Sequence, residues 1–197
     1  RVGITAVYVT HDQSEAMAIS DQIIIMSKGV GEQMGSPQEI YYHPKNEFVA
    51  DFIGESNILD GVMKKDFAIE FSGHVFKCVD KGFSEDELVD VVIRPEDVDI
   101  TTPEKGMISG VVTNVTFKGV HYEIIVDIGG FKWMIQTTDY SAVGDKIGLL
   151  IKPDEIHVMK KSKYSGRYGD YSSFSDEMDH ISDVDEILVD VEETEDE

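Results

Sequence analysis

The chain is poor in the features that usually fix the class of a protein. It has one cysteine, Cys78, among 197 residues, so no disulfide can form within it, a usage that fits a reducing compartment. No apolar run approaches the roughly 20 residues of a membrane-spanning helix, and the first residues do not have the pattern of a signal peptide. Basic residues are scarce: 17 stand against 39 acidic residues, for a formal net charge of −22. This charge argues against nucleic acid or an anionic membrane surface as a partner.

The acidic residues are concentrated at the end of the chain. Residues 164–197 hold 13 of them against one basic residue, Arg167, whereas residues 1–163 hold 26 against 16. The aromatic residues of this stretch are scattered among glycine, serine and aspartate. Such a composition predicts a solvated, disordered acidic tail. The run Ile187-Leu188-Val189 offers an alternative interpretation, a short docking segment within that tail.

A histidine at the end of an apolar run is the first candidate functional residue. Residues 4–9 are almost entirely apolar, as a strand covered on both faces of a parallel sheet would be, and His11 follows closely. Asp12 and Glu15 have the spacing of a helix N-cap and its capping box. Because ligands of open α/β sheets bind beyond the carboxyl ends of the strands, His11 is placed to reach a bound phosphate. A purely structural role is the alternative for a histidine in this position.

The elements that follow continue an α/β pattern. Residues 22–26 predict a second buried strand. Ser36, Pro37 and Glu39 mark a helix start, with a cap, a proline at the first helical position and a capping box. Asn46 caps a further helix with one apolar face. These elements are too few to form an α/β sheet that is covered on both faces. Because the chain also begins with Arg1 rather than Met, we expect it to be the back half of a larger protein.

This first stretch contains a recognisable series of short motifs: Thr10-His11-Asp12-Gln13, Glu15-Ala16, Asp21, Met26, Gly29, Glu32-Gln33, Gly35, Pro37, Ile40-Tyr41, Pro44, Asn46, Phe48-Val49-Ala50 and Phe52-Ile53-Gly54. The series resembles the end of an ATP-binding cassette (ABC) ATPase, within the importer subfamily that carries a C-terminal regulatory domain. His11 matches the switch histidine of that family. Gly31 departs from the pattern, because the family usually has a branched apolar residue before Glu-Gln, and this departure is expected to loosen the turn.

The resemblance implies an activity for which the chain lacks several parts. It contains no Gly-x-x-x-x-Gly-Lys-Ser/Thr phosphate loop, no Leu-Ser-Gly-Gly-Gln signature and no apolar strand ending in Asp-Glu. We therefore expect that this chain does not hydrolyse ATP by itself. For the intact protein the resemblance implies ATP and Mg²⁺ as cofactors and a head-to-tail homodimer with a second ATPase subunit. In that dimer His11 would contact the γ-phosphate.

Short β segments replace the α/β pattern after residue 56. Eight stretches have strand patterns: 67–71, 74–79, 88–93, 108–117, 121–128, 131–136, 147–151 and 156–159. Ser72-Gly73 and Gly129-Gly130 are tight-turn signals. Many short strands with glycine turns are typical of a closed or partly closed barrel.

Three motifs of this region carry a second resemblance: Val92-Ile93-Arg94-Pro95-Glu96-Asp97, Phe117-Lys118-Gly119-Val120-His121-Tyr122-Glu123 and Pro153-Asp154-Glu155-Ile156-His157-Val158-Met159. The first resembles the hallmark of the TOBE domain, the OB-like barrel fused to importer ATPases. The other two are similar to the ATPase subunits of spermidine/putrescine importers. The domain organisation expected is an incomplete P-loop ABC ATPase domain of α/β class (1–55), an all-β TOBE regulatory barrel (56–163) and the acidic disordered tail (164–197).

The conspicuous polar residues of the barrel have ordinary structural interpretations. Arg94 is expected to pair with Glu96 or Asp97. His121 and His157 lack the paired spacing of a metal site, so no metal site is predicted. An OB-like barrel that binds nucleic acid needs a basic groove, which this composition disfavours.

The leading hypothesis for function is the C-terminal portion of the ATP-hydrolysing, energy-coupling subunit of an ABC importer for spermidine/putrescine. Such a subunit would bind transmembrane permease subunits at the cytoplasmic face of the cell membrane, as a peripheral protein. Two alternatives stay open: a stand-alone TOBE-type small-ligand-binding or regulatory module, and an inactive truncated product. The negative charge favours a polyamine over an anion as a regulatory ligand of the barrel or tail.

Overall fold

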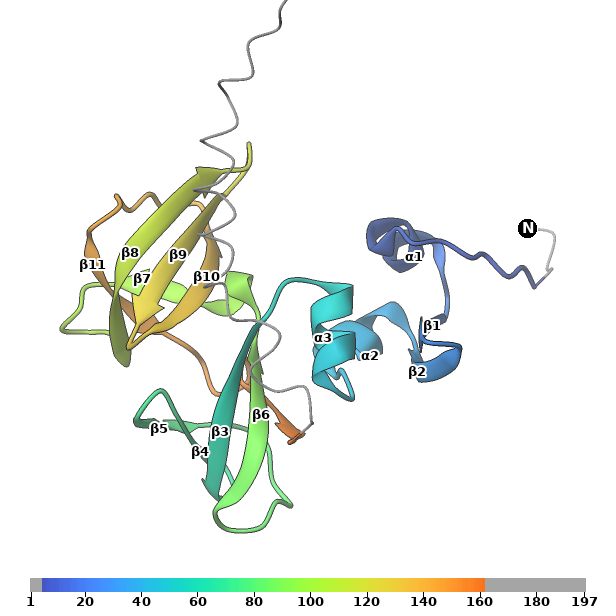
Figure 1. Ribbon diagram of the computed structural model, residues 1–197, viewed down its shortest axis with the longest axis horizontal. Coiled ribbons are helices and arrows are strands. Elements are labelled where there is room, and N and C mark those ends of the chain that lie inside the picture. The colour runs from blue at the N-terminus through green and yellow to red at the C-terminus, as the bar shows by residue number, and fades with distance from the viewer. Residues whose placement is uncertain (1–4, 162–197) are drawn as a thin grey trace, which may run out of the picture.

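The computed structural model describes residues 5–161 of the chain. The predicted acidic tail, 164–197, lies outside the described residues. Residues 5–55, which we term the N-terminal segment, contain three short helices and one hairpin: α1 (Gln13–Ile19), β1 (Ile23–Ser27), β2 (Val30–Gly35), α2 (Pro37–Tyr42) and α3 (Glu47–Ile53). They lie beside a β barrel that starts with the next strand, and α3 is the helix nearest to the barrel (Figure 1).

The first predicted strand is not formed. Residues 5–10 have no regular secondary structure, and the side chains of Val7 and Val9 are 90% and 89% exposed. A strand needs a neighbour for its backbone N–H and C=O groups, and the two strands of the N-terminal segment, β1 and β2, pair with each other. Residues 5–9 therefore have the apolar composition of a strand, but no neighbouring strand among the described residues pairs with them.

The second predicted strand is formed, but as one arm of an antiparallel hairpin. Ile25 of β1 pairs with Gln33 of β2, and Lys28 and Gly29 make the turn with φ angles of 48° and 81°. Two positive φ values match the right-handed twist of the paired strands. Ile23 and Ile25 are buried, whereas Ile24 and Met26 are exposed. The expectation of a strand buried on both faces is wrong here, because β1 alternates between a covered and an open face.

The helix starts lie where the sequence predicts them. Asp12 accepts a hydrogen bond from the backbone N–H of Glu15 at 3.0 Å, and Asn46 caps α3 in the same way. Ser36 and Glu39 form the predicted capping box at the start of α2. The helices and the hairpin share a small core of five buried residues: Ile23, Ile25, Ile40, Val49 and Ile53.

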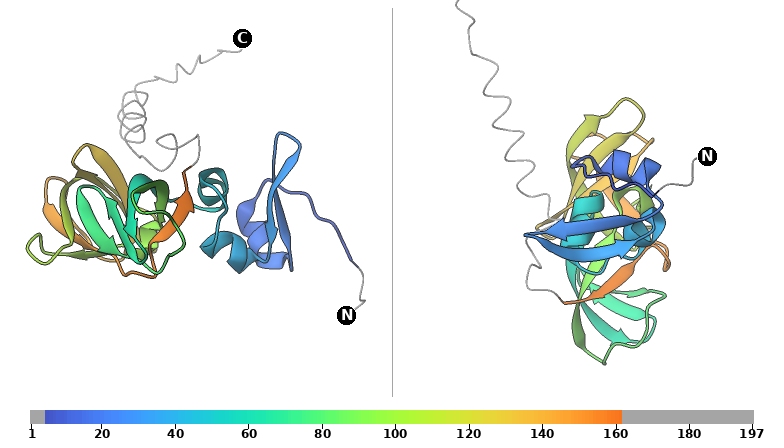
Figure 2. Two further views of the ribbon diagram at one scale, coloured as in Figure 1. Left: turned by 90° about the horizontal axis from the view of Figure 1, so that it is seen from below. Right: turned by 90° about the vertical axis from the view of Figure 1, so that its right-hand side faces the viewer.

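Two five-stranded antiparallel sheets form the barrel (Figure 2). The first has the order β12-β6-β3-β4-β5, from β3 (Asn57–Lys65), β4 (Ala68–Phe71), β5 (His74–Lys77), β6 (Glu87–Ile93) and β12 (His157–Lys160). The second has the order β10-β9-β8-β11-β7, from β7 (Asp99–Thr101), β8 (Ile108–Phe117), β9 (Tyr122–Ile128), β10 (Phe131–Thr137) and β11 (Lys146–Leu150). A 3₁₀ turn, η1 (Pro95–Asp97), follows β6. The expectation of a partly closed, OB-like barrel is met in its coarse form.

One continuous apolar core fills the space between the two sheets. It includes Met63 and Val91 from the first sheet and Trp133 from the second, all of them fully buried. Asn57, also fully buried, connects the sheets through its side-chain amide, which donates to the carbonyl of Met134 at 2.8 Å and accepts from the N–H of Met134 at 2.7 Å. The side chain of Asn57 in β3 thereby supplies the hydrogen-bond partners that a neighbouring strand would otherwise supply to the backbone of Met134 in β10.

Candidate functional site

His11 lies on the surface in the turn that precedes α1. The turn is held by hydrogen bonds around Glu15, whose carboxylate accepts from the hydroxyls of Tyr8 at 2.9 Å and Thr10 at 3.3 Å. The imidazole of His11 is exposed to solvent. Helix α1 stands on the side of the N-terminal segment away from the barrel, so the structure does not bring His11 together with the polar groups of the barrel (Figure 1).

The densest polar cluster of the described residues lies at the junction between the N-terminal segment and the barrel. Its centre is Arg94, which follows β6 and is 6% exposed. Nη1 of Arg94 donates to the carbonyls of Ala50 and Gly54, each at 2.9 Å, and to the hydroxyl of Ser56 at 2.5 Å. Nη2 donates to the carbonyl of Tyr41 at 2.9 Å.

These acceptors are the free ends of two helices. The carbonyls of Tyr41 and Ala50 belong to the last four residues of α2 and α3, which have no partner within their own helix, and Gly54 is the C-cap of α3. A cation at a helix C-terminus also interacts favourably with the helix dipole. Arg94 therefore caps both helices from the barrel side. The planar guanidinium, with five donors in a fixed fork, suits this task better than a lysine ammonium.

The sequence prediction for Arg94 did not include this role. It assigned the side chain to the acidic residues two and three positions further along. The observed acceptors are 38 to 53 residues upstream and are mostly backbone carbonyls. Every residue has a backbone carbonyl, so residue types do not show which carbonyls accept a hydrogen bond. The one available signal is the position of the arginine between an apolar strand and a proline.

Tyr41 makes a second connection across the junction. Its ring lies under the guanidinium, with Cζ of Arg94 4.3 Å from the ring centroid, and its hydroxyl donates to Oε1 of Glu96. Burial, followed by the hydrogen bond to Glu96, raises the pKa of Tyr41. The phenol therefore keeps its proton and remains the donor in this contact.

A histidine makes the third connection. Burial, the largest effect, lowers the pKa of His157, which favours the neutral ring. Its Nε2 lies 3.3 Å from the carbonyl of Pro44 in the N-terminal segment and donates to it. The ring of His43 lies edge-on at a centroid distance of 5.9 Å. The predicted structural role of His157 is consistent with these contacts.

An open groove of about 320 Å³ runs beside these contacts. It is lined by Tyr42, His43, Val79, Asp80, Asp154, Ile156 and His157. Asp97 lies in an adjoining recess, where burial, and after it the charges of Glu96 and Glu155, raise the pKa of Asp97 to about 6. Among residues 5–161, no cluster of histidine, cysteine or acidic side chains is arranged to hold a metal ion. Chemically, the junction connects two parts of the chain through hydrogen bonds and presents an acidic groove beside them.

Comparisons with known proteins found a family model that matches part of the barrel. Residues 91–159, which include Arg94 and the motif around it, match the family model of the TOBE domain. Among solved structures, the cytoplasmic molybdate-binding protein ModG covers 53% of the chain at a TM-score of 0.46 and 14% identity, a likeness too distant to indicate a ligand. No helix of the described residues is long and apolar enough to cross a membrane.

Closer relatives cover most of the chain. The spermidine/putrescine import ATP-binding protein PotA of Desulfitobacterium hafniense is 55% identical over 163 residues, which are 83% of this chain and 47% of that protein. The proteins of the same name from Clostridioides difficile and Borreliella afzelii are 52% and 50% identical over 82% of the chain and 46% of their own length. The chain thus spans about half the length of the curated relatives it matches, and aligns with their C-terminal part. Over most of its length the chain is therefore similar to the C-terminal part of ATP-binding proteins of spermidine/putrescine import, and its residues 91–159 match the TOBE domain.

Proposed function

We propose that the chain is the C-terminal portion of the ATP-hydrolysing, energy-coupling subunit of an ABC importer for spermidine or putrescine. The observation that carries this proposal is the identity of 50–55% over more than four-fifths of the chain, a span too long to be confined to the barrel. Such a likeness includes residues on both sides of the Arg94 junction.

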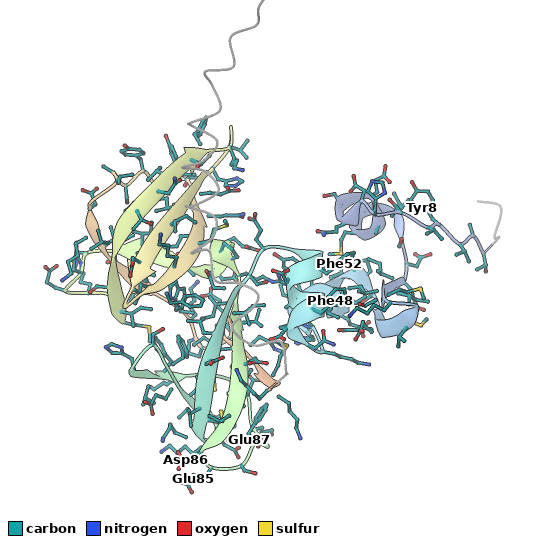
Figure 3. All side chains as sticks on the ribbon, in the orientation of Figure 1. Tyr8, Phe48, Phe52, Glu85, Asp86 and Glu87 are labelled. Carbon is teal, nitrogen blue, oxygen red and sulfur yellow. The ribbon has the colours of Figure 1, made fainter. Side chains whose placement is uncertain are left out.

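Exposed apolar surface supports the assignment of residues 1–55 to an incomplete ATPase domain. Ile24 and Met34 lie opposite each other on the open face of the hairpin and are 57% and 59% exposed. Tyr8 projects from the unpaired segment before α1, and Phe52 stacks on Phe48 at the surface of α3 (Figure 3). Large apolar side chains exposed on several elements of so small a unit indicate surface that other elements cover. Further strands of the same domain would cover it.

In the complete subunit the missing phosphate loop would hold ATP and Mg²⁺, and His11 would contact the γ-phosphate from the turn before α1. His11 suits that role because its imidazole is exposed and its two neighbours are hydrogen-bonded to each other, the N–H of Asp12 donating to the hydroxyl of Thr10 at 2.9 Å. Two such subunits would form a homodimer against transmembrane permease subunits, at the cytoplasmic face of the membrane. The barrel, 56–163, would be the regulatory domain of each subunit.

A polyamine is also the regulatory ligand that the charge of the chain favours, over an anion. Asp80 and Asp154 line the groove beside the junction. Calorimetry with spermidine at low salt is expected to show binding that Asp80→Asn and Asp154→Asn weaken. The absence of heat would remove this part of the proposal without affecting the rest.

Uptake and hydrolysis in the complete transporter test the main proposal. The natural gene product, purified with its permease, is expected to hydrolyse ATP and to import labelled spermidine, and His11→Ala is expected to abolish both while nucleotide binding is retained. Residues 1–197 alone are expected to hydrolyse no ATP. The proposal fails if the natural gene product is no longer than this chain, or if His11→Ala leaves ATP hydrolysis intact. A stand-alone binding module or an inactive product would then be the remaining interpretations.

A further inference from the structure

We propose that Arg94 is the positioning residue through which the barrel sets the place of α2 and α3. By this proposal, a movement of the loop after β6 is passed directly to both helices. The ends of both helices are then mechanically coupled to the barrel through this side chain, in addition to the other contacts of the junction.

The helices need an outside partner. Helix α2 has six residues and α3 has seven, and isolated helices of fewer than about 12 residues are marginal in water. Their last carbonyls require donors that the helices themselves cannot supply. Arg94 supplies donors to Tyr41 of α2 and to Ala50 and Gly54 at the end of α3. One guanidinium therefore joins both helix ends, and at the end of α3 the hydroxyl of Ser56 also donates to the carbonyls of Ala50 and Gly54, each at 3.2 Å.

The barrel side of the contact is firmly fixed. Arg94 directly follows Ile93, a fully buried residue of β6, the strand that lies between β12 and β3. The 3₁₀ turn η1 follows Arg94 and lies against β10 of the other sheet. The backbone of Arg94 thus lies where the two sheets meet, and a shift of one sheet relative to the other would move its side chain.

Other contacts accompany Arg94 across the junction: Ala50 of α3 lies in a buried apolar cluster with Ile58, Val92 and Met159 of the barrel, and Gln136 of β10 donates to Glu55 at 2.8 Å. The hydroxyl of Tyr41 donates to Glu96, and His157 donates to the carbonyl of Pro44. Each of these hydrogen bonds joins a single pair of groups, and the apolar cluster involves α3 alone, whereas Arg94 donates to the ends of both helices. We therefore expect the N-terminal segment to remain attached without the guanidinium, but α2 and α3 to lose their fixed ends.

The inference rests on the proposed function in one respect: only if that function is correct does the coupling carry a signal from a regulatory barrel to an ATPase domain. The coupling itself is a property of residues 5–161. It can be tested in the present chain, without ATP, permease or polyamine. Failure of the proposed function and failure of the coupling are therefore separate results.

Hydrogen exchange measured by mass spectrometry tests the coupling in the full chain. Arg94→Met is expected to speed exchange of the amides of α3 by about tenfold or more, because charged hydrogen bonds at the helix end are lost. Amides of β6 are expected to change less than about twofold. Trp133, the single tryptophan, is buried in the barrel core and reports on it, so its emission is expected to stay native. Lys105→Met, at an exposed turn, is the matched control and is expected to change neither helix.

Chemical rescue separates positioning from bulk packing. Addition of methylguanidinium at tens of millimolar to Arg94→Ala is expected to restore slow exchange in α3, whereas methylammonium at the same concentration is not. Arg94→Lys is expected to restore it only in part, because the fork is lost. Unchanged exchange of α3 in Arg94→Met, equal rescue by both cations, or loss of the native Trp133 emission would each overturn the inference. In the last case Arg94 would stabilise the barrel itself.

Discussion

Replacement of the buried amide of Asn57 is the sharpest test of how the two sheets are joined. Asn57→Ala removes the donor to the carbonyl of Met134 and the acceptor for its N–H. Both residues are fully buried, so water cannot take over these contacts without opening the barrel. The same amide also donates to the carbonyl of Ile93 at 3.3 Å, a longer contact.

The magnitude follows from the two groups of Met134 that lose their partner. Each buried donor or acceptor left unsatisfied costs about 1–3 kcal/mol. The free energy of unfolding is therefore expected to fall by about 2–6 kcal/mol, a large fraction of the 5–15 kcal/mol that is typical of a domain. Asn57→Asp keeps the acceptor for the N–H but places a carboxylate against the Met134 carbonyl, so it is expected to be more destabilising at neutral pH than at acid pH.

Urea unfolding followed by the emission of Trp133, one residue before Met134, measures the effect. Asn114→Ala is the control, because Asn114 is half-buried in β8 and its Oδ1 accepts from the hydroxyl of Thr116 at 3.2 Å. We expect it to cost less than about 1 kcal/mol. A free energy of unfolding of Asn57→Ala within about 0.5 kcal/mol of the wild type, with a cooperative transition, would refute the reasoning about the sheet connection.

Two further predictions concern single side chains. The pKa of Asp97 is raised to about 6, above its ordinary 3.8, chiefly by burial, so protonation favours the folded state and stability rises as pH falls through 6. Asp97→Asn is expected to raise the free energy of unfolding at pH 7.5 by about 1 kcal/mol, after allowance for solvent screening of this half-exposed group, with no gain near pH 4. A gain of equal size at both values would contradict the assignment. Gly110→Ala would place a Cβ 2.6 Å from Cγ1 of Val126 and against the carbonyl of Asp127, and is expected to lower the urea midpoint by the equivalent of about 2 kcal/mol. Gly31→Val, with only Ile24 nearby at 3.8 Å, is expected to leave it unchanged.

Local sequence signals predicted local structure well. The caps at Asp12, Ser36 and Asn46 are found as expected, because a cap depends on residues within one helical turn. The hairpin at Ser72-Gly73 is found for a similar reason, since positive φ at both positions is a property of the turn itself. These signals require no knowledge of distant parts of the chain.

Elements that depend on distant partners were missed or misassigned. Strand β3 has an acidic residue and a glycine at its centre, Asp60 and Gly61, which obscured its pattern. The glycine is required there because a Cβ would lie 2.6 Å from Cγ2 of Val91 on the neighbouring strand. Residues 5–9 have the composition of a strand but no partner among the described residues. The role of His11 is still a prediction, since it depends on groups that this chain does not contain.

The order of stability among the three helices provides a final test of this view. All three are short, and α1 differs from the others because it has no buried residue and its last turn ends at Ser20 without a contact to Arg94. Helices α2 and α3 each bury part of one face, and their C-terminal ends are capped from the barrel. If caps from the barrel stabilise these helices more than intrinsic propensity does, α1 is expected to exchange its amides fastest and α3 slowest. Exchange of α1 as slow as that of α3 in the isolated chain would show that the N-terminal cap at Asp12 alone is sufficient, and the barrel would not be needed to explain the helices.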